Sequence, residues 1–221
     1  MDGIVPAAGM ATRMRGIPKF LLPCDRSYTT LIENHLREML KFCETIWIPT
    51  RPELVLLLDS LGIAQDRVVV LPIVTNNMTE TVQRVLQIAS ANSFQLIMPD
   101  TFFLGETPYE TLQNDPEIAD LACWIIREEQ KGKLGQVLTN EHGVVADMKD
   151  KDPTCTYPIS WGALTFSRNL EKYMKSDHPH IGYAVKDALL DGGTVTAQTI
   201  SGQYFDCGTP DEYLSMLENA L

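Results

Sequence analysis

Short apolar runs alternate with longer amphipathic segments along most of the chain. Short apolar runs that stop at turn residues are typical of buried strands, and apolar positions three and four residues apart are typical of helices. The pattern predicts strands at residues 3–6, 45–49, 67–71, 94–98, 121–126, 136–139, 144–148, 160–166 and 194–200. It predicts helices at residues 31–42, 52–61, 79–91, 108–114, 169–174, 182–190 and 210–220.

The order of these elements indicates the fold class. Strands and helices alternate through the first half, which favours a mainly parallel sheet covered by helices. Residues 136–139 and 144–148 flank a short turn and predict a hairpin, so the sheet should be mixed. No linker rich in Pro, Ser or Gly separates the halves. We therefore expect one α/β domain over residues 1–221, with halves at about 1–115 and 116–221.

Composition and charge limit the classes of partner that the protein is expected to bind. The chain has 221 residues, 44% of them hydrophobic, and a formal net charge of −11. An acidic chain without a basic face argues against nucleic-acid binding. The five cysteines are scattered and form no Cys-x-x-Cys pair, so a zinc site or a disulfide framework is not expected. No secretory leader or membrane-length apolar run is present. We expect a cytoplasmic protein with no membrane partner.

Residues 4–23 are the most informative segment for chemistry. A predicted strand ends in a run of small residues and is followed by two cations: Ala7, Ala8, Gly9, Met10, Ala11, Thr12, Arg13 and Lys19. Small residues let the main chain approach a ligand, and loop N–H groups can line a phosphate. Two cations can neutralise a polyphosphate. By residue type alone, a strand, a turn and a solvated basic loop would explain the segment equally well.

Two aspartates stand where strands are expected to end. Asp100 follows an apolar run, and Asp206 precedes Gly208-Thr209-Pro210 and a predicted helix. The carboxyl ends of strands in open α/β sheets face the ligand crevice. Taken singly, Asp100 is better explained by capping of the following turn, and the second motif can be explained by a helix cap at Thr209.

In combination, these motifs resemble those of the sugar-phosphate nucleotidylyltransferases. The resemblance rests on Ala-Ala-Gly-Met-Ala-Thr-Arg-Met, Pro-Lys-Phe-Leu-Leu-Pro, the aspartate at residue 100 and Asp-x-Gly-Thr-Pro-x-x-Tyr at residues 206–213. It spans nearly the whole chain and implies a three-layer Rossmann-like fold with a mainly parallel mixed sheet. A dinucleotide fingerprint would need three spaced glycines, and a P-loop would need Gly-Lys-Ser/Thr, so neither motif is present.

The resemblance implies a role for each matched residue of the triphosphate site. Residues 7–12 and Pro99 would contact the nucleotide, and Arg13, Lys19 and Asp100 would be catalytic. Asp100 and Asp206 would jointly hold Mg²⁺, an ion that takes few protein carboxylates and completes its shell with water and phosphate oxygens. Ala11 replaces the glycine that usually precedes Thr-Arg in the family, and its added methyl group is expected to narrow the approach of the phosphates.

The nucleobase contacts would come from residues 76–83, with Thr79 and Gln83 as the contacting residues. The sequence Thr79-Glu80-Thr81 departs from the common versions of this segment. The resemblance therefore leaves the identity of the base open.

The second substrate is implied by three weaker matches. Leu134-Gly135-Gln136-Val137 is similar to a Tyr-Gly-Val-Val segment, residues 147–153 to a Glu-Lys-Pro segment, and Trp161-Gly162 to the start of a strand with a sugar-facing glycine. The resemblance implies sugar-phosphate binding by four residues: Gly135, Asp150, Lys151 and Gly162. By residue type alone, residues 147–153 would equally be a charged surface loop.

These residues together predict an Mg²⁺-dependent condensation of a nucleoside triphosphate with a sugar 1-phosphate, which yields a nucleotide sugar and pyrophosphate. Many members of the family assemble, so a homo-oligomer is an option. One alternative is transfer to a non-sugar phosphate or phosphonate, such as an alcohol phosphate or choline phosphate. Another is a catalytically silent regulatory domain that binds nucleotides.

Overall fold

A computed structural model describes residues 1–130 and 132–220 of the chain. Its strands are β1 (Asp2–Ile4), β2 (Ile46–Thr50), β3 (Val68–Pro72), β4 (Ser93–Ile97), β5 (Thr101–Leu104), β6 (Ala119–Ile125), β7 (Gly135–Thr139), β8 (Val145–Asp150), β9 (Ile159–Ser167), β10 (Val195–Thr199) and β11 (Gln203–Asp206). Its α-helices are α1 (Leu31–Met39), α2 (Pro52–Ser60), α3 (Met78–Leu86), α4 (Pro108–Thr111), α5 (Ile181–Leu190) and α6 (Pro210–Ala220). Four 3₁₀ turns complete the described elements: η1 (Thr12–Met14), η2 (Lys19–Leu21), η3 (Glu128–Gln130) and η4 (Arg168–Tyr173).

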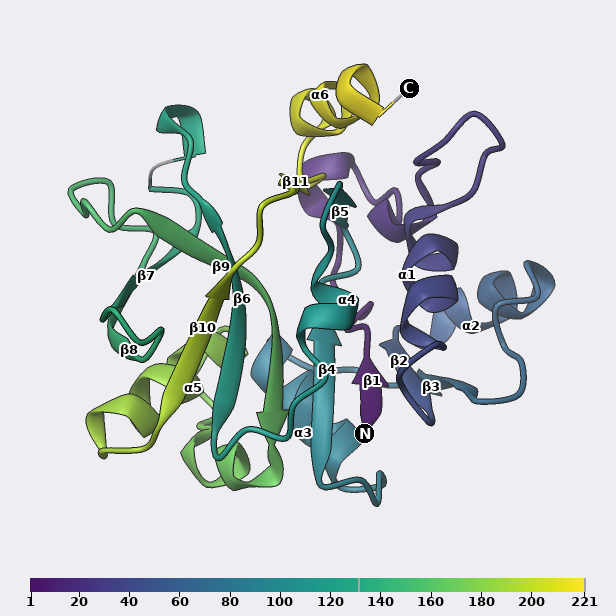
Figure 1. The fold of residues 1–221 in the computed structure, drawn as a ribbon. Helices are drawn as coiled ribbons and strands as arrows, with labels where there is room; N and C mark the ends of the chain where they lie inside the picture. The colour runs from purple at the N-terminus through teal and green to yellow at the C-terminus, as the bar shows by residue number, and fades with distance from the viewer. Residues whose placement is uncertain (131, 221) are drawn as a thin grey trace.

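The main sheet has the strand order β10-β6-β9-β4-β1-β2-β3, and the hairpin β7–β8 joins it through β9 (Figure 1). Along this order, β10–β6, β4–β1, β1–β2 and β2–β3 are parallel pairs, and β9 runs antiparallel to both of its neighbours. The mainly parallel mixed sheet predicted from the sequence is confirmed.

Helices cover both faces of this sheet, which gives three layers. One hydrophobic cluster joins α3 and α5 to the sheet through residues such as Val82, Phe94 and Val185. A second cluster joins α1, α2 and α4 to the opposite face through residues such as Ile32 and Ile48. The three-layer Rossmann-like arrangement is therefore confirmed as well.

A small antiparallel ribbon of β5 and β11 lies at the edge of the sheet where β1 and β4 end, with α6 beside it (Figure 1). A third apolar cluster, which includes Cys24, Phe205 and Met216, packs α6 and β11 against the segment before α1. The Tyr213 hydroxyl donates to the Pro23 carbonyl at 2.8 Å. These contacts hold late residues of the chain against its first loops.

Several predicted elements differ in extent or type. The predicted helix at 79–91 already ends at Leu86, because the Arg168 guanidinium donates to the carbonyls of Leu86, Ala89 and Ala91. The helix predicted at 169–174 is the 3₁₀ turn η4. No strand was predicted at β5, which begins only a few residues after β4 ends.

None of the helices in the part of the chain that the structure describes is both long enough and apolar enough to cross a membrane. The longest described helix, α6, has 11 residues.

Candidate active site

A cavity of about 360 Å³ opens at the carboxyl ends of β1 and β4. All six residues 7–12 of the first loop line it, together with the two cations, and Pro99 and Asp100 line it from the end of β4. The structure thus brings together two segments, residues 7–19 and 99–100, that the sequence assigned to one triphosphate site.

Local hydrogen bonds give the first loop its path. The Ala7 N–H donates to the Pro49 carbonyl at 2.9 Å, and the Thr50 hydroxyl donates to the Ala7 carbonyl at 3.1 Å, so the loop leaves the sheet at Ala7. Ala11 then adopts φ 49°, and its carbonyl accepts from the N–H groups of Met14 and Gly16 at 3.0 Å each. A left-handed conformation is one that glycine adopts at little cost. The backbone at Ala11 is therefore one that the glycine expected from the resemblance would adopt at little cost.

Lys19 and Asp100 form an ion pair across the cavity edge. Phe20, next to Lys19, is 4% exposed and packs in the second apolar cluster, which fixes the turn that carries the lysine. The side chains of Lys19 and Asp100 are 13% and 17% exposed, so their charges are only weakly screened by water.

Asp206 is brought to Asp100 by the β5–β11 ribbon. In this ribbon Asp206 is paired with Thr101, the residue after Asp100, and the Cys207 N–H donates to the Asp100 carbonyl at 2.8 Å. Arg13 approaches the same place. A Cβ atom on Gly208 would lie 2.8 Å from an Asp206 carboxylate oxygen and 3.2 Å from both terminal nitrogens of Arg13. A side chain at this position would have to displace the ends of both groups.

The electrostatics of this cluster are those of a site short of positive charge. Burial raises the pKa of Asp206 to about 6, and the nearby carboxylates of Asp100 and Glu212 act in the same direction, while Lys19 and Arg13 oppose the shift. A raised pKa means that the ionised carboxylate is costly without an additional cation.

The donor set fits Mg²⁺. Two adjacent carboxylates at a cavity edge offer oxygen ligands, and Mg²⁺ commonly binds one or two protein carboxylates and takes its remaining ligands from water and phosphate. The described residues contain no cluster of three or more His, Cys, Asp or Glu side chains that would favour a metal held by protein alone. Asp100 and Asp206 would therefore share the ion with a bound substrate.

The segment before α3 forms a further wall of the cavity, lined by Thr75, Asn76, Asn77, Met78 and Thr81. Thr79 and Gln83, the predicted base contacts, are not among the described residues that line it. Thr79 is fully buried, and the Gln83 amide donates to the Met174 carbonyl at 3.2 Å. The segment predicted from the sequence therefore lines the cavity, but the residues that do so are the neighbours of Thr79 and Gln83.

A second cavity of about 250 Å³ lies at the start of β9 and α5. Asp150 lines it, and this carboxylate accepts from the Tyr183 hydroxyl at 3.2 Å and pairs with His180 Nε2 at 3.3 Å. Trp161 also lines this cavity.

The other predicted sugar-phosphate residues lie around this second cavity rather than in it. Among the described residues that line it, the basic side chains are Lys149, Lys186 and His180, and Lys151 is not one of them. A Cβ on Gly135 would lie 2.2 Å from Trp161 Nε1, and one on Gly162 would lie 2.4 Å from the Tyr204 ring. Both glycines thus make room for aromatic rings.

Sequence reasoning missed several cavity residues. Thr75 precedes the segment that the resemblance matched, and Lys186 lies inside a helix with no motif around it. His180 reads as part of a plain loop, yet its Nδ1 accepts from the Gly182 N–H at 3.2 Å at the start of α5. For Lys186, the signal available in the sequence was a basic residue in the predicted helix at 182–190, which comes after the predicted strand that carries Trp161.

An α/β sheet with a small-residue loop, two cations and two carboxylates at its carboxyl edge defines a nucleotide-binding protein of the nucleotidyltransferase class. Residues 3–185 match the family described as the MobA-like NTP transferase domain, and the chain belongs to this family. No curated protein matches the chain in sequence.

Solved structures agree with this assignment at the level of the fold. A UDP-glucose pyrophosphorylase complexed with UDP-glucose is 17% identical with a TM-score of 0.79, and the match covers 99% of this chain and 97% of that one. A putative glucose-1-phosphate thymidylyltransferase from Bacillus anthracis is 19% identical with a TM-score of 0.78, over 100% and 95% of the two chains. The inositol-1-phosphate CTP transferase from T. maritima is 14% identical with a TM-score of 0.77, over 99% and 95%.

Proposed function

We propose that the protein transfers a nucleotidyl group from a nucleoside triphosphate to a sugar 1-phosphate and releases pyrophosphate, with Mg²⁺ as its metal ion. The observation that carries the proposal is the grouping of two cations and two carboxylates beside the first cavity: Arg13, Lys19, Asp100 and Asp206. Family membership and the likeness to sugar-phosphate nucleotidylyltransferases support the same reaction.

The reaction is an in-line substitution at phosphorus. An oxygen of the acceptor phosphate attacks the α-phosphorus, the bond from that phosphorus to the α,β-bridging oxygen breaks, and pyrophosphate leaves with the electron pair. A phosphate monoester is largely ionised near neutral pH, so the attacking oxygen needs no general base. Rate enhancement then comes from positioning and from neutralising charge.

Each charged residue has a distinct part in this scheme. Arg13 neutralises the β- and γ-phosphates and the departing pyrophosphate. Lys19 exchanges its partner Asp100 for the α-phosphate oxygens. Bound to Asp100 and Asp206, Mg²⁺ would supply positive charge to the α-phosphate and the incoming oxygen.

The second cavity is the proposed site of the acceptor. Asp150 is suited to accept hydrogen bonds from sugar hydroxyls, and Gly135 and Gly162 are the proposed points of close approach. The acceptor phosphate would be held by Lys151 from the resemblance and by Lys149 and Lys186, which line the cavity. All five cysteines are unpaired, which suits a reducing compartment, so a cytoplasmic location is part of the proposal.

A non-sugar acceptor is the second candidate. The rings of Trp161, His180 and Tyr183 lie against one another at the second cavity, with centroids 5.9 Å apart for Trp161–His180 and 4.9 Å for His180–Tyr183. Aromatic rings next to a carboxylate also suit a cationic or alcohol phosphate. The similar fold of the inositol-1-phosphate CTP transferase supports the inclusion of such acceptors.

Pyrophosphate release with panels of triphosphates and acceptor phosphates tests the proposal. We expect turnover with a sugar 1-phosphate, and loss of a preorganised cation in Arg13→Ala should lower kcat by about 10²–10³-fold. Asp206→Asn should abolish turnover at all practical Mg²⁺ concentrations. Full turnover in either variant would refute the roles of Arg13 and Asp206. Triphosphate binding without turnover on any acceptor would favour a regulatory domain instead.

A further inference from the structure

The wall of the first cavity formed by the residues before α3 is uncharged. Thr75, Asn76 and Thr81 face the cavity with polar side chains, whereas the charged lining residues come from other segments. Neutral hydrogen-bonding groups suit a heterocycle better than a phosphate. If the proposed function holds, this wall is where the base of the triphosphate is recognised, and the direction of each hydrogen bond in it decides which base fits.

The hydroxyl of Thr81 fixes the direction of its neighbour's hydrogen bond. Thr81 Oγ1 lies 3.0 Å from the Asn77 carbonyl, which can only accept, so the single proton of this hydroxyl is donated there. Thr81 Oγ1 also lies 2.6 Å from Thr75 Oγ1. With that proton assigned to the Asn77 carbonyl, Thr75 is the donor of the second bond. Thr75 therefore has no proton left for a ligand and can only accept.

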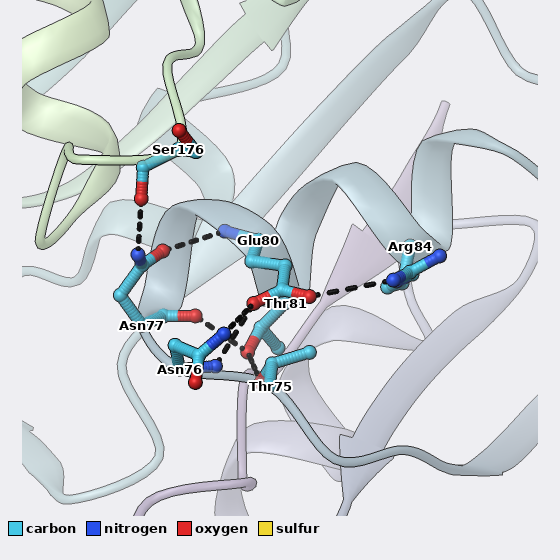
Figure 2. A network of polar contacts seen from close by, with 7 residues as sticks. All are labelled: Thr75, Asn76, Asn77, Glu80, Thr81, Arg84 and Ser176. Atoms are coloured by element: carbon cyan, nitrogen blue, oxygen red, sulfur yellow. Dashed lines mark hydrogen bonds and ion pairs between the residues drawn. The ribbon is translucent and has the colours of Figure 1, made fainter.

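The side chain of Glu80 fixes the amide of Asn76. One carboxylate oxygen of Glu80 accepts from the Asn76 backbone N–H at 2.9 Å and from Asn76 Nδ2 at 3.0 Å. The bond from the Asn76 backbone N–H lowers the pKa of Glu80, so the carboxylate is ionised and can only accept. The amide must turn its nitrogen to Glu80 and its oxygen away from it, as Figure 2 shows.

Asn77 is held by two hydrogen bonds, which leave one proton of its Nδ2 uncommitted. Its Nδ2 donates to the Ser176 carbonyl at 2.8 Å, and its Oδ1 accepts from the Glu80 N–H at 2.8 Å (Figure 2). Within residues 1–130 and 132–220, no donor contacts Asn76 Oδ1, and Thr75 Oγ1 has only its bond to Thr81. The side chains of Thr75 and Asn76 thus present two acceptors, Thr75 Oγ1 and Asn76 Oδ1, and one Nδ2 proton remains on each of Asn76 and Asn77.

The extra acceptor distinguishes between pyrimidine bases. The Asn76 amide alone could pair with N4–H and N3 of cytosine or with N3–H and O4 of uracil, since each edge offers one donor next to one acceptor. The second acceptor, Thr75 Oγ1, distinguishes the two bases. Cytosine has a second N4 proton for Thr75 Oγ1, whereas O4 of uracil or thymine would place lone pairs against lone pairs.

We propose that the protein selects a triphosphate whose base carries an exocyclic amino group beside an unprotonated ring nitrogen, as CTP does, over one with a carbonyl there, as UTP and dTTP have. Thr75 is the specificity-determining residue of this scheme. Thr81 and Glu80 are positioning residues that set which way the hydrogen bonds at Thr75 and Asn76 run.

Calorimetric titration of CTP and UTP with Mg²⁺ tests the proposal, since the two ligands differ only at the edge in question. We expect CTP to bind at least about tenfold more tightly than UTP, because a buried polar group that loses its partner carries a large penalty. In Thr81→Val, which removes the hydroxyl at nearly constant volume, the Thr75 proton is released and can be donated to O4. The ratio of the two affinities should fall to less than about threefold.

Thr81→Ser is the matched control and should keep the ratio, since it keeps the hydroxyl. Thr75→Val is a second route to the same test at a half-buried loop position, and it should weaken CTP binding more than UTP binding. Melting curves of each variant verify that it is folded. A ratio unchanged in both valine variants would overturn the proposal.

The outcome also separates this inference from the proposed function. Equal or tighter binding of UTP, with pyrophosphate release, would refute base selection and leave nucleotidyl transfer intact. Failure of CTP and UTP to bind, with pyrophosphate release from another triphosphate of the panel, would refute base selection alone. Failure of every triphosphate in the panel to bind would remove the proposed function and this inference together.

Discussion

At the scale of single residues, His35 is a histidine placed where its charged form is not tolerated. It lies fully buried on α1, and its Nδ1 is 2.7 Å from the Tyr109 hydroxyl. Burial lowers the pKa of His35 to about 4 from its usual 6.5, although the Asp100 carboxylate acts in the opposite direction. The fold therefore holds this imidazole neutral at pH values where an unfolded chain would protonate it.

This difference makes stability depend on pH in a defined direction. Between pH 6.5 and 4 the unfolded chain binds the extra proton, so the free energy of unfolding must fall as the pH falls through that window. The contribution of His35 amounts to about 2 kcal/mol between about pH 7.5 and about pH 5. Urea denaturation at the two pH values measures it. In His35→Asn, which cannot titrate, the loss over the same interval should be smaller by that amount, and an identical loss would contradict the assignment.

Ala11 and Lys151 show how far the sequence could predict the behaviour of single residues. The sequence shows that alanine stands at position 11, and from residue size alone the expected consequence is crowding of the phosphates. The structure shows a different consequence, because Ala11 has φ 49°, a backbone conformation that favours glycine. Lys151, predicted to hold the acceptor phosphate, also has a positive φ of 52°, and of the two neighbouring lysines it is Lys149 that lines the second cavity. Side-chain direction in such a turn depends on φ, which a residue pattern does not encode.

At the scale of elements, the ribbon of β5 and β11 determines whether the two carboxylates meet. The turn that enters β11 is packed tightly. A Cβ on Gly202 would lie 2.3 Å from the Glu106 carbonyl oxygen and 2.6 Å from that of Leu104. Ser201 donates to the Glu106 carboxylate from its N–H at 2.9 Å and its hydroxyl at 2.6 Å. Since Gly202 contacts main chain, any side chain there must move the strand.

Gly202→Ala should therefore disturb the Asp100–Asp206 site and leave the main sheet folded. We expect β11 to shift from β5, Asp206 to move away from Asp100, and kcat to fall by on the order of 10²-fold, as for a misplacement of a catalytic group by about 1 Å. Far-UV circular dichroism should stay that of the unsubstituted protein. Ser201→Ala is the control, because it removes one hydrogen bond and adds no atom at the contact. Equal turnover in both variants would show that the ribbon does not position Asp206.

The elements that the sequence predicted well are those with local causes. Strands β1, β2 and β4 follow from apolar runs, and the start of α1 from the capping box formed by Thr30 and Glu33. Strand β5 was missed because its only partner is β11, far along the chain. The early end of α3 was missed because it depends on Arg168, which contacts the helix end from a distant turn.

At the scale of the whole molecule, negative charge is spread over the surface while the cations of the site are concentrated at one cavity. The chain carries a formal charge of −11, whereas the charged residues that line the first cavity are Arg13, Lys19 and Asp100. Long-range repulsion is screened by salt, whereas ion pairs in contact and partly buried are screened much less. The net negative charge should therefore repel an approaching triphosphate at long range, and Arg13 and Lys19 should attract it only at short range.

The association rate of the triphosphate should for this reason rise with salt. As ionic strength increases from about 0.01 to about 0.15 M, the Debye length shrinks from about 30 Å to about 8 Å and the repulsion is removed. Stopped-flow binding at constant free Mg²⁺ measures the effect. A steep fall in rate, of the kind that basic nucleic-acid binders show, would contradict it.

The fold class, most of its elements and the family could be reached from the sequence, because three motifs stood in order along one chain. The resemblance implied that Asp100 and Asp206 lie together. In the structure, the pairing of β5 with β11 brings Asp206 next to Asp100. The sequence could not predict which side chains before and within α3 line the first cavity, since this depends on helix phase and on hydrogen bonds to a loop at residues 176–179.

The ribbon has a consequence for how the protein comes into being. A ribosome that has polymerised the chain through β10 has made every strand of the nine-stranded sheet, but it has not yet added Asp206. Asp206 and β11 are thus the last part of the proposed site to be synthesised. A stop codon placed after β10 would leave every strand of the main sheet in the product and remove the second carboxylate of the proposed metal site.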